Sequence, residues 1–157
     1  MNTKNVYEKM AELHIQLPRP IDDGACLSTI RPFGEKFLYI SGIGPMKEEQ
    51  APALGKIPSQ VSIEEGIEAA RCCALNALAS LHAYLGDLEK IKSFVKLIVF
   101  VSSERDFTSQ HLVADGASRL LMDLFGDEIG KSARSAVGTS SLPLNYPVEV
   151  EMFVELK

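Results

Sequence analysis

The sequence contains few of the residues that form disulfide bonds or bind metal ions. Its 157 residues include three cysteines, three histidines and no tryptophan. The histidines stand alone, with no His-x-x-x-His and no Cys-x-x-Cys pair, so the spacings of known metal sites are missing. Cys72 and Cys73 are neighbours, and an odd number of cysteines makes no disulfide framework. We expect a protein of the reducing cytoplasm that needs no metal and no disulfide.

Long apolar runs and clusters of basic residues are also lacking. No stretch of about 18 apolar residues could span a membrane, and we expect no secretory signal in the polar segment from Met1 to Leu17. The net charge is −5, and the 16 Lys and Arg residues are spread along the chain. Because nucleic-acid binding relies on clustered positive charge, we expect neither a nucleic-acid partner nor a membrane partner.

The hydrophobic pattern predicts one α+β domain behind a short helical extension. The extension covers residues 1–20 and the domain residues 21–157, a usual length for a single core. Within the domain, a period of two indicates strands and a period of three to four indicates helices, in the order ββαβαββ. The expected elements are strands 26–31 and 36–41, helix 62–85, strand 90–102, helix 108–125, and strands 133–139 and 147–156. Two helices would then pack on one face of a mixed sheet.

Two of these elements carry clear signals. Ser62 and Glu65 form a Ser-x-x-Glu capping box before the first long helix, and Gly86 stands at its end. Strand 90–102 is apolar on both faces: one face is expected to hold Ile91, Val95, Leu97, Val99 and Val101, and the other Phe94, Ile98 and Phe100, joined by Phe153 of the last strand. Because two helices cover only one face, we expect an oligomer to bury the second.

The most informative charged residue is Arg134, in a strand of small and apolar residues. Desolvating a guanidinium without an anionic partner is costly, so this arginine needs an acid. Two interpretations stay open: a structural ion pair with Glu149 or Glu151 across a hairpin of the last two strands, or an anchor for a ligand carboxylate. Glu149 and Glu151 share one face of the last strand, where a carboxylate can act as a general acid or base.

Two other patterns predict little chemistry. Ser41-Gly42-Ile43-Gly44 contains a Gly-x-Gly but lacks the third glycine and the following helix of a dinucleotide-binding turn. Cys26 could serve as a thiol nucleophile, but no histidine lies near it in the sequence. A small buried residue is the more frequent role for a free cysteine.

Three segments near the C-terminus resemble the signature of the reactive-intermediate deaminase family, also called the YjgF family and often labelled endoribonuclease L-PSP. They are Ala133-Arg134-Ser135, Leu142-Pro143 and Val148-Glu149-Val150-Glu151, and their spacing matches without a gap. Ile40-Ser41-Gly42 with Pro45 is similar to the family's Ser-Gly strand end. The resemblance covers the chain from about Gly24 onward, within a longer branch of the family.

The resemblance implies a chorismate-mutase-like fold and a homotrimer whose sheets form a central barrel, with sites in the clefts between subunits. It implies cofactor-free hydrolysis of 2-imino and enamino acids, such as 2-aminoacrylate, to 2-keto acids and ammonia. Arg134 would bind the substrate carboxylate, Glu149 would position or activate water, and Ser41 and Gly42 would line the pocket. The alternative is a non-catalytic trimer that binds small carboxylates or regulates a partner.

The chain departs from the family pattern at two lining positions. Cys26 stands where the archetype carries a tyrosine, and Asp115 stands where it carries an asparagine, so both would line the pocket. These changes alter the pocket more than the arginine anchor, and they favour the non-catalytic alternative. RNA cleavage, which the older label suggests, conflicts with the acidic net charge, and a chorismate-mutase-like isomerisation rests on fold analogy alone.

Overall fold

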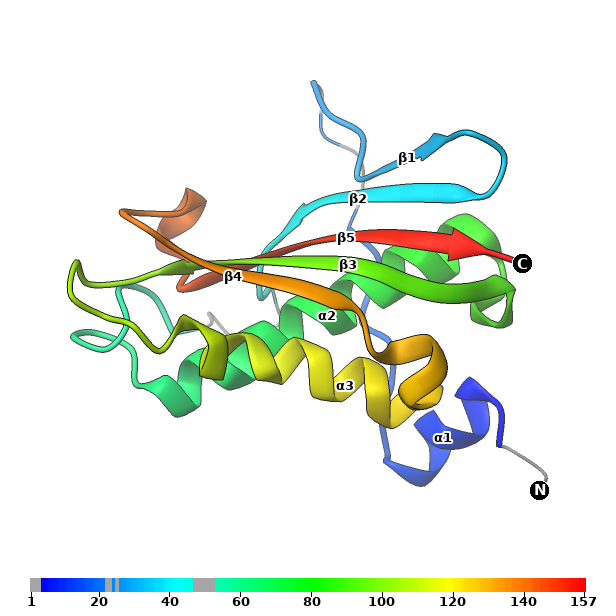
Figure 1. Ribbon diagram of the computed structural model, residues 1–157, viewed down its shortest axis with the longest axis horizontal. Helices are drawn as coiled ribbons and strands as arrows, with labels where there is room; N and C mark the ends of the chain where they lie inside the picture. The colour runs from blue at the N-terminus through cyan, green and yellow to red at the C-terminus, as the bar shows by residue number, and fades with distance from the viewer. Residues whose placement is uncertain (1–3, 22–23, 25, 47–52) are drawn as a thin grey trace.

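The computed structural model describes residues 4–21, 24, 26–46 and 53–157, and its elements form two layers. Figure 1 shows a five-stranded sheet lying over two long helices, with a short N-terminal helix beside them. The elements are α1 (Val6–Glu12), β1 (Ile30–Phe33), β2 (Phe37–Ile43), α2 (Ile63–Leu85), η1 (Leu88–Lys90), β3 (Ile91–Ser102), α3 (Gln110–Gly130), β4 (Ala133–Thr139), η2 (Pro143–Asn145) and β5 (Val148–Leu156). The predicted α+β class and the order ββαβαββ are confirmed. The first three residues of the predicted 1–20 extension lie outside the described residues.

The sheet has the strand order β1-β2-β5-β3-β4. β3 and β4 run parallel, and every other pair of neighbours is antiparallel. The predicted hairpin of the last two strands is therefore wrong, because β3 lies between β4 and β5. Parallel neighbours need a crossover connection, and α3 supplies it between β3 and β4. This crossover decides which side chains can meet at the site.

The first hairpin is confirmed, with its strands shifted along the chain. β1 begins at Ile30 and not at Cys26, because the described residues just before it make no strand pairing beyond an isolated bridge between Gly24 and Leu27. The turn contains Gly34, whose φ of 61° lies in the left-handed region that glycine tolerates. β2 continues two residues beyond its expected end, and this extension carries part of the candidate site.

The long helix α2 forms as its sequence predicts. Ser62 caps it: the side chain accepts a hydrogen bond from the amide of Glu65, and Glu65 bonds back to the amide of Ser62. Gly86 ends the helix in the left-handed conformation. A run of alanines on the buried face lets the helix lie close to the sheet, and Ala70, Ala74 and Ala77 are fully buried.

In β3, the predicted assignment of side chains to the two faces is wrong at one end. The pairing with β5 shifts between Ile91 and Ser93 and again between Phe94 and Lys96, so the strand contains two β-bulges. Each bulge inserts one residue and reverses the alternation of side chains beyond it. Phe94 is therefore buried against the helices, whereas Val95 is 42% exposed. The rest of the prediction for this strand holds.

The second long helix is longer than predicted and is broken by a glycine. α3 begins at Gln110, two residues after the expected start, and Gly126 interrupts it with a φ of 74° before a final helical segment. Packing against α2 is tight, since a Cβ on Gly116 would lie 1.9 Å from the carbonyl oxygen of Ile67. Only glycine allows the two backbones to approach this closely.

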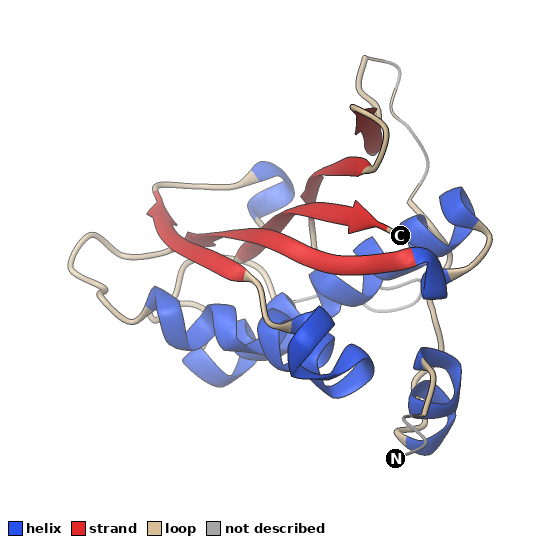
Figure 2. Cartoon of the chain, turned by 45° about the vertical axis from the view of Figure 1, so that its right-hand side comes forward, coloured by secondary structure: helices blue, strands red, loops and turns tan. Residues whose placement is uncertain are grey.

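The N-terminal helix α1 packs against the end of α3 and is tied to the turn that precedes β3 (Figure 2). The amide of Val6 donates to Glu89 at 3.0 Å, and the Tyr7 hydroxyl donates to Asp87 at 3.0 Å. The same hydroxyl accepts a hydrogen bond from the amide of Leu88. These bonds account for the order of a helix too short to be stable alone.

Candidate functional site

Three of the predicted site residues meet on the open face of the sheet, the face without helices. The pairing of β2 with β5 shifts between Ile40 and Ile43, so Ser41 and Gly42 form a bulge opposite β5. Glu149 lies directly over this bulge: a Cβ placed on Gly42 would be 1.6 Å from Glu149 Oε1. Glycine at position 42 is therefore what gives the Glu149 carboxylate room to cross β2.

The environment of Glu149 favours its neutral form. Burial raises the pKa of Glu149, and the neighbouring negative charge of Glu151 raises this pKa further. Among the described residues Glu149 accepts no hydrogen bond and has no cationic partner, so nothing offsets these two effects. A half-buried carboxyl group with a raised pKa can accept a proton from water and return it.

Glu151 is held by a tyrosine from the next strand. Tyr39 donates its hydroxyl proton to Glu151 Oε2 at 2.6 Å, and this hydrogen bond to a carboxylate, with burial, raises the pKa of Tyr39 to about 12.

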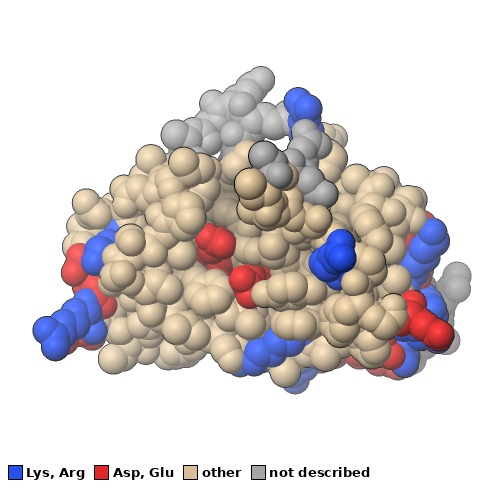
Figure 3. Space-filling model, turned by 90° about the horizontal axis from the view of Figure 1, so that it is seen from above, with Lys and Arg blue, Asp and Glu red and all other residues tan. Residues whose placement is uncertain are grey.

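Further along the same face, Lys96 Nζ donates to Ser135 Oγ at 2.7 Å. Figure 3 looks down on this side of the molecule, where uncharged atoms cover most of the surface and acidic side chains gather near its middle.

Arg134 faces the other way, toward α3. Its Nη1 donates to Asp115 Oδ1 at 2.8 Å and to Ser118 Oγ at 3.0 Å, and its Nη2 donates to the carbonyl oxygen of His111 at 3.2 Å. The side chain is 22% exposed, so the group is paired without being sealed off. A guanidinium has five N–H donors, and these three bonds leave two, with Nε–H among them, without a hydrogen bond to a described residue.

Arg134 and Glu149 lie on opposite faces of the sheet within one chain. Arg134 is in register with Leu97, which is buried beneath the helices, whereas Glu149 is in register with Phe100 on the open face. The predicted alternative of an ion pair with Glu149 or Glu151 is therefore wrong, and the structural partner of Arg134 is Asp115. A single copy of the chain does not bring the arginine and Glu149 together.

The two predicted lining residues Cys26 and Asp115 are also apart. Cys26 is exposed in the segment before β1 and is not the small buried residue that its type predicts. Asp115, on α3, binds Arg134 and lies 3.5 Å from Arg119 Nη2. The other two cysteines are buried in α2, and burial raises the pKa of the Cys73 thiol well above its ordinary value.

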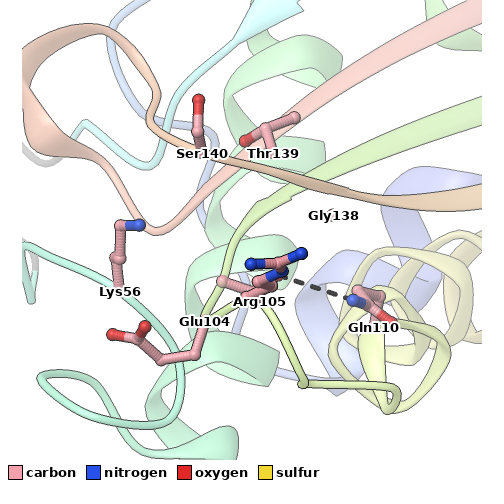
Figure 4. A pocket seen from close by; sticks show the side chains of 8 residues that line it. Lys56, Glu104, Arg105, Gln110, Gly138, Thr139 and Ser140 are labelled. Atoms are coloured by element: carbon pink, nitrogen blue, oxygen red, sulfur yellow. Dashed lines mark hydrogen bonds between the residues drawn. The ribbon is translucent and has the colours of Figure 1, made fainter.

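A cavity at the carboxyl ends of β3 and β4 was not predicted from the sequence. Its volume is about 440 Å³, and it is lined by Lys56, Ser103, Glu104, Arg105, Gln110, Gly138, Thr139 and Ser140 (Figure 4). The carboxyl ends of neighbouring parallel strands commonly hold ligands. The signal that could have found the cavity was two polar segments, each directly following a strand, but the parallel pairing of those strands was not predicted.

The fold and these residues agree with comparisons to known proteins. A family model described as "YjgF/chorismate mutase-like, putative endoribonuclease" matches residues 22–156. The chain belongs to the YjgF/chorismate mutase-like family. Protein TCP17 of Trypanosoma cruzi is 44% identical over 119 residues, which are 76% of this chain and 74% of that protein.

Two solved structures superpose closely on this chain. A protein of unknown function from Agrobacterium tumefaciens, Atu1372, has 37% identity and a TM-score of 0.88 over 97% of this chain and 92% of its own. A protein from Shewanella oneidensis, whose structure carries the endoribonuclease label, has 25% identity and a TM-score of 0.91 over 98% and 100%. The predicted family and the chorismate-mutase-like fold are thus confirmed.

Two further features of this YjgF-type chain concern membrane-spanning helices and metal-binding clusters. Within the part of the chain that the structure describes, no helix is both long and apolar enough to cross a membrane. Among the same residues, no three His, Cys, Asp or Glu side chains come together in a group that could hold a metal ion.

Proposed function

We propose that the chain hydrolyses reactive 2-imino and enamino acids to 2-keto acids and ammonia, in a cleft between two copies of a homotrimer. One copy would supply Arg134 and its neighbour Glu149. The observation that carries the proposal is the Glu149 carboxylate, which lies half-buried over Gly42 with a raised pKa and no hydrogen-bond partner among the described residues. Membership of the YjgF family supports it.

The chemistry needs a proton acceptor, a water molecule and a carboxylate anchor. Glu149 takes a proton from water as the water oxygen bonds to the C=N carbon, and it passes this proton to the imine nitrogen, which gives a neutral adduct with one hydroxyl and one amino group. Glu149 then takes the hydroxyl proton and delivers it to the amino nitrogen as the carbon–nitrogen bond breaks, so ammonia leaves, the carbon keeps the oxygen as the keto group, and Glu149 is ionised again. An enamine first gains a proton at carbon to become the imine. Because imines react with water unaided, orientation and proton transfer suffice.

The two unused donors of Arg134 support its role as the carboxylate anchor. A bidentate hydrogen bond to a carboxylate needs two N–H groups. After the bonds to Asp115, Ser118 and His111, two N–H groups of the guanidinium are still available. Asp115 also holds the guanidinium in one position, which lowers the entropy lost when a ligand binds. Its charge weakens the attraction for an anion, so Asp115 sets how tightly the anchor can bind.

This competition from Asp115 favours one alternative, a trimer that binds small carboxylates without catalysis. An arginine already paired with an acid suits weak, reversible anion binding. The two functions differ in one measurement: the non-catalytic protein would bind a 2-keto acid and leave the rate of imine decay unchanged.

The test couples the protein to an amino-acid oxidase and follows decay of the imine that the oxidase releases, across a panel of amino acids. Arg134→Ala and Glu149→Gln should each abolish the acceleration. The matched controls are Arg31→Ala, an exposed arginine on β1, and Glu155→Gln, on the same strand as Glu149, and both should keep the rate.

Mixing the two inactive variants tests the location between copies. After joint unfolding and refolding, roughly a quarter of the wild-type rate should return, since each site draws one residue from each of two copies taken at random. No recovery in a refolded, mixed oligomer would contradict the shared site. Wild-type activity in Arg134→Ala would remove the arginine from the reaction.

A further inference from the structure

The cavity at the carboxyl ends of β3 and β4 is a separate feature from the Arg134 and Glu149 groups. Gly138 lies on its wall, four residues beyond Arg134 on β4, which places the two about 13 Å apart along the strand. Figure 4 shows the side chains of Lys56 and Arg105 reaching into the same space from different segments, with Thr139 and Ser140 on the far side. Nothing in the proposed imine reaction uses this cavity.

The cavity contains two cations that have no acidic partner. In the described part of the chain, neither Lys56 nor Arg105 forms a salt bridge or a side-chain hydrogen bond. Glu104 also lines the space, but its Oε1 accepts the hydroxyl proton of Ser59 at 2.5 Å. Two positive charges and one carboxylate therefore line a hollow of about 440 Å³, which leaves a local excess of positive charge in a protein whose net charge is −5.

Neutral donors surround the two cations. Ser103 and Ser140 contribute hydroxyl groups, whereas the Thr139 hydroxyl donates to the carbonyl oxygen of Val101. The side-chain amide of Gln110, the first residue of α3, donates to Phe107 and Ser103. The N-terminus of this helix carries a partial positive charge, and the capping residue Ser109 makes no side-chain hydrogen bond to the first-turn amides.

The packing at the back of the cavity fixes this arrangement. A Cβ on Gly138 would lie 2.9 Å from Gln110 Nε2 and 2.9 Å from Ser103 Oγ, so glycine lets these two polar groups reach the cavity wall. Gln110 donates to the carbonyl oxygen of Phe107 at 2.6 Å, which holds its side chain there. The polar lining is therefore set by the fold before any ligand arrives.

We propose that this cavity binds a small phosphate ester. A phosphate carries up to two negative charges and several acceptor oxygens, which match two cations, two serine hydroxyl groups and a helix N-terminus better than a single carboxylate does. The volume exceeds that of the phosphate group alone, and Glu104 at the wall can accept hydrogen bonds from hydroxyl groups on the organic part. A polymeric nucleic acid does not fit the acidic protein.

The test measures binding of glycerol 3-phosphate, inorganic phosphate, acetate and glycerol to the full chain by isothermal titration calorimetry. Glycerol 3-phosphate should bind most tightly and glycerol not at all. Arg105→Ala and Lys56→Ala should each weaken binding roughly ten-fold or more, the loss expected for a charge-assisted hydrogen bond. Arg31→Ala on β1 is the matched control and should bind as the wild type does.

Three results would overturn the proposal. Unchanged affinity in Arg105→Ala and Lys56→Ala would place any binding elsewhere, and equal affinity for acetate would remove the phosphate assignment. Inorganic phosphate binding as tightly as the ester would show that the organic part makes no contact. Imine hydrolysis is measured in parallel: because the cavity lies apart from Arg134, Arg105→Ala should keep that rate, and a loss of hydrolysis without a loss of phosphate affinity contradicts the separation of the two sites.

Discussion

Replacing Gly42 by alanine tests whether the position of the Glu149 carboxylate matters. The new methyl group would fall 1.6 Å from Glu149 Oε1, 2.6 Å from its Cδ and 3.1 Å from its Cγ, so the two side chains cannot both keep their places. The backbone at position 42 is not in the left-handed region, so alanine itself meets no conformational strain there. The Glu149 side chain must therefore move away.

The expected effect on stability is small, because the atoms in the way belong to the free end of a flexible side chain. Turning Glu149 to a less favoured rotamer costs about 0.5–1.5 kcal/mol, and replacing glycine at a compatible position returns about 0.4–1 kcal/mol through the unfolded state. The free energy of unfolding should stay within about 1 kcal/mol of the wild type, a shift in melting temperature of roughly 2–4 °C at most.

The expected effect on the proposed reaction is large. A positioned general base contributes about 100-fold or more to rate, so Gly42→Ala should lose kcat/KM to a similar extent as Glu149→Ala. In a Glu149→Ala background the same Gly42→Ala change should cost nothing more, because the carboxylate it displaces is already gone. A Gly42→Ala variant that folds normally and hydrolyses imines at the wild-type rate would refute the reasoning about Glu149.

Three further predictions follow from the same contacts. The pKa of Glu149 is raised in the folded protein, so the protonated side chain contributes fully to stability below the ordinary pKa of 4.5, and this contribution is lost as the pH rises through the raised pKa. The melting temperature of Glu149→Gln, measured relative to the wild type, should therefore increase from acidic pH to about pH 8. In Glu151→Gln the pKa of Tyr39 should fall from about 12 toward 10.0, measured by absorbance of the ionised phenol, and an unchanged value would mean that Glu151 is not its cause. Gly116→Ala must push against the backbone oxygen of Ile67 and should lose about 1–3 kcal/mol, or roughly 2–12 °C in calorimetry, whereas a neutral result would show that the two helices are not in contact there.

Local signals predicted most of the fold, because they act within a few residues. The capping box at Ser62 and the glycine at Gly86 bounded α2 to within a residue, and the alternation in the last strand assigned its two faces correctly. The prediction failed in β3 between Phe94 and Val95, where two bulges invert the pattern. A bulge is set by how a strand pairs with its neighbour, and no pattern within the strand itself records that pairing.

The candidate site was harder to predict because it depends on which strands are neighbours. Arg134 and Glu149 are fifteen positions apart on consecutive strands, as their numbers show, and a hairpin would have put them within reach of each other. Because α3 forms a crossover between β3 and β4, β3 lies between the strands that carry Arg134 and Glu149. Arg134 pairs with Leu97 and Glu149 pairs with Phe100, and these two residues of β3 point to opposite faces of the sheet. The arginine needs an acid in either arrangement, and the fold provides Asp115 on the helix that made the crossover.

The described helices and strands also leave the β4 edge and one face of the sheet uncovered in a single copy of the chain. β4 is an edge strand, so its outer backbone groups have no partner strand in a single copy, and exposed edges are usually covered or paired. The open face carries exposed Phe33 and Phe37 near Glu155, and exposed Val137 in register with Phe100 and, through it, with Glu149. A second copy lying against this face and edge would bury apolar surface and bring a foreign Arg134 toward Glu149. Assembly and the proposed chemistry would then depend on the same contact, so a variant that separates the copies should lose activity even with every site residue intact.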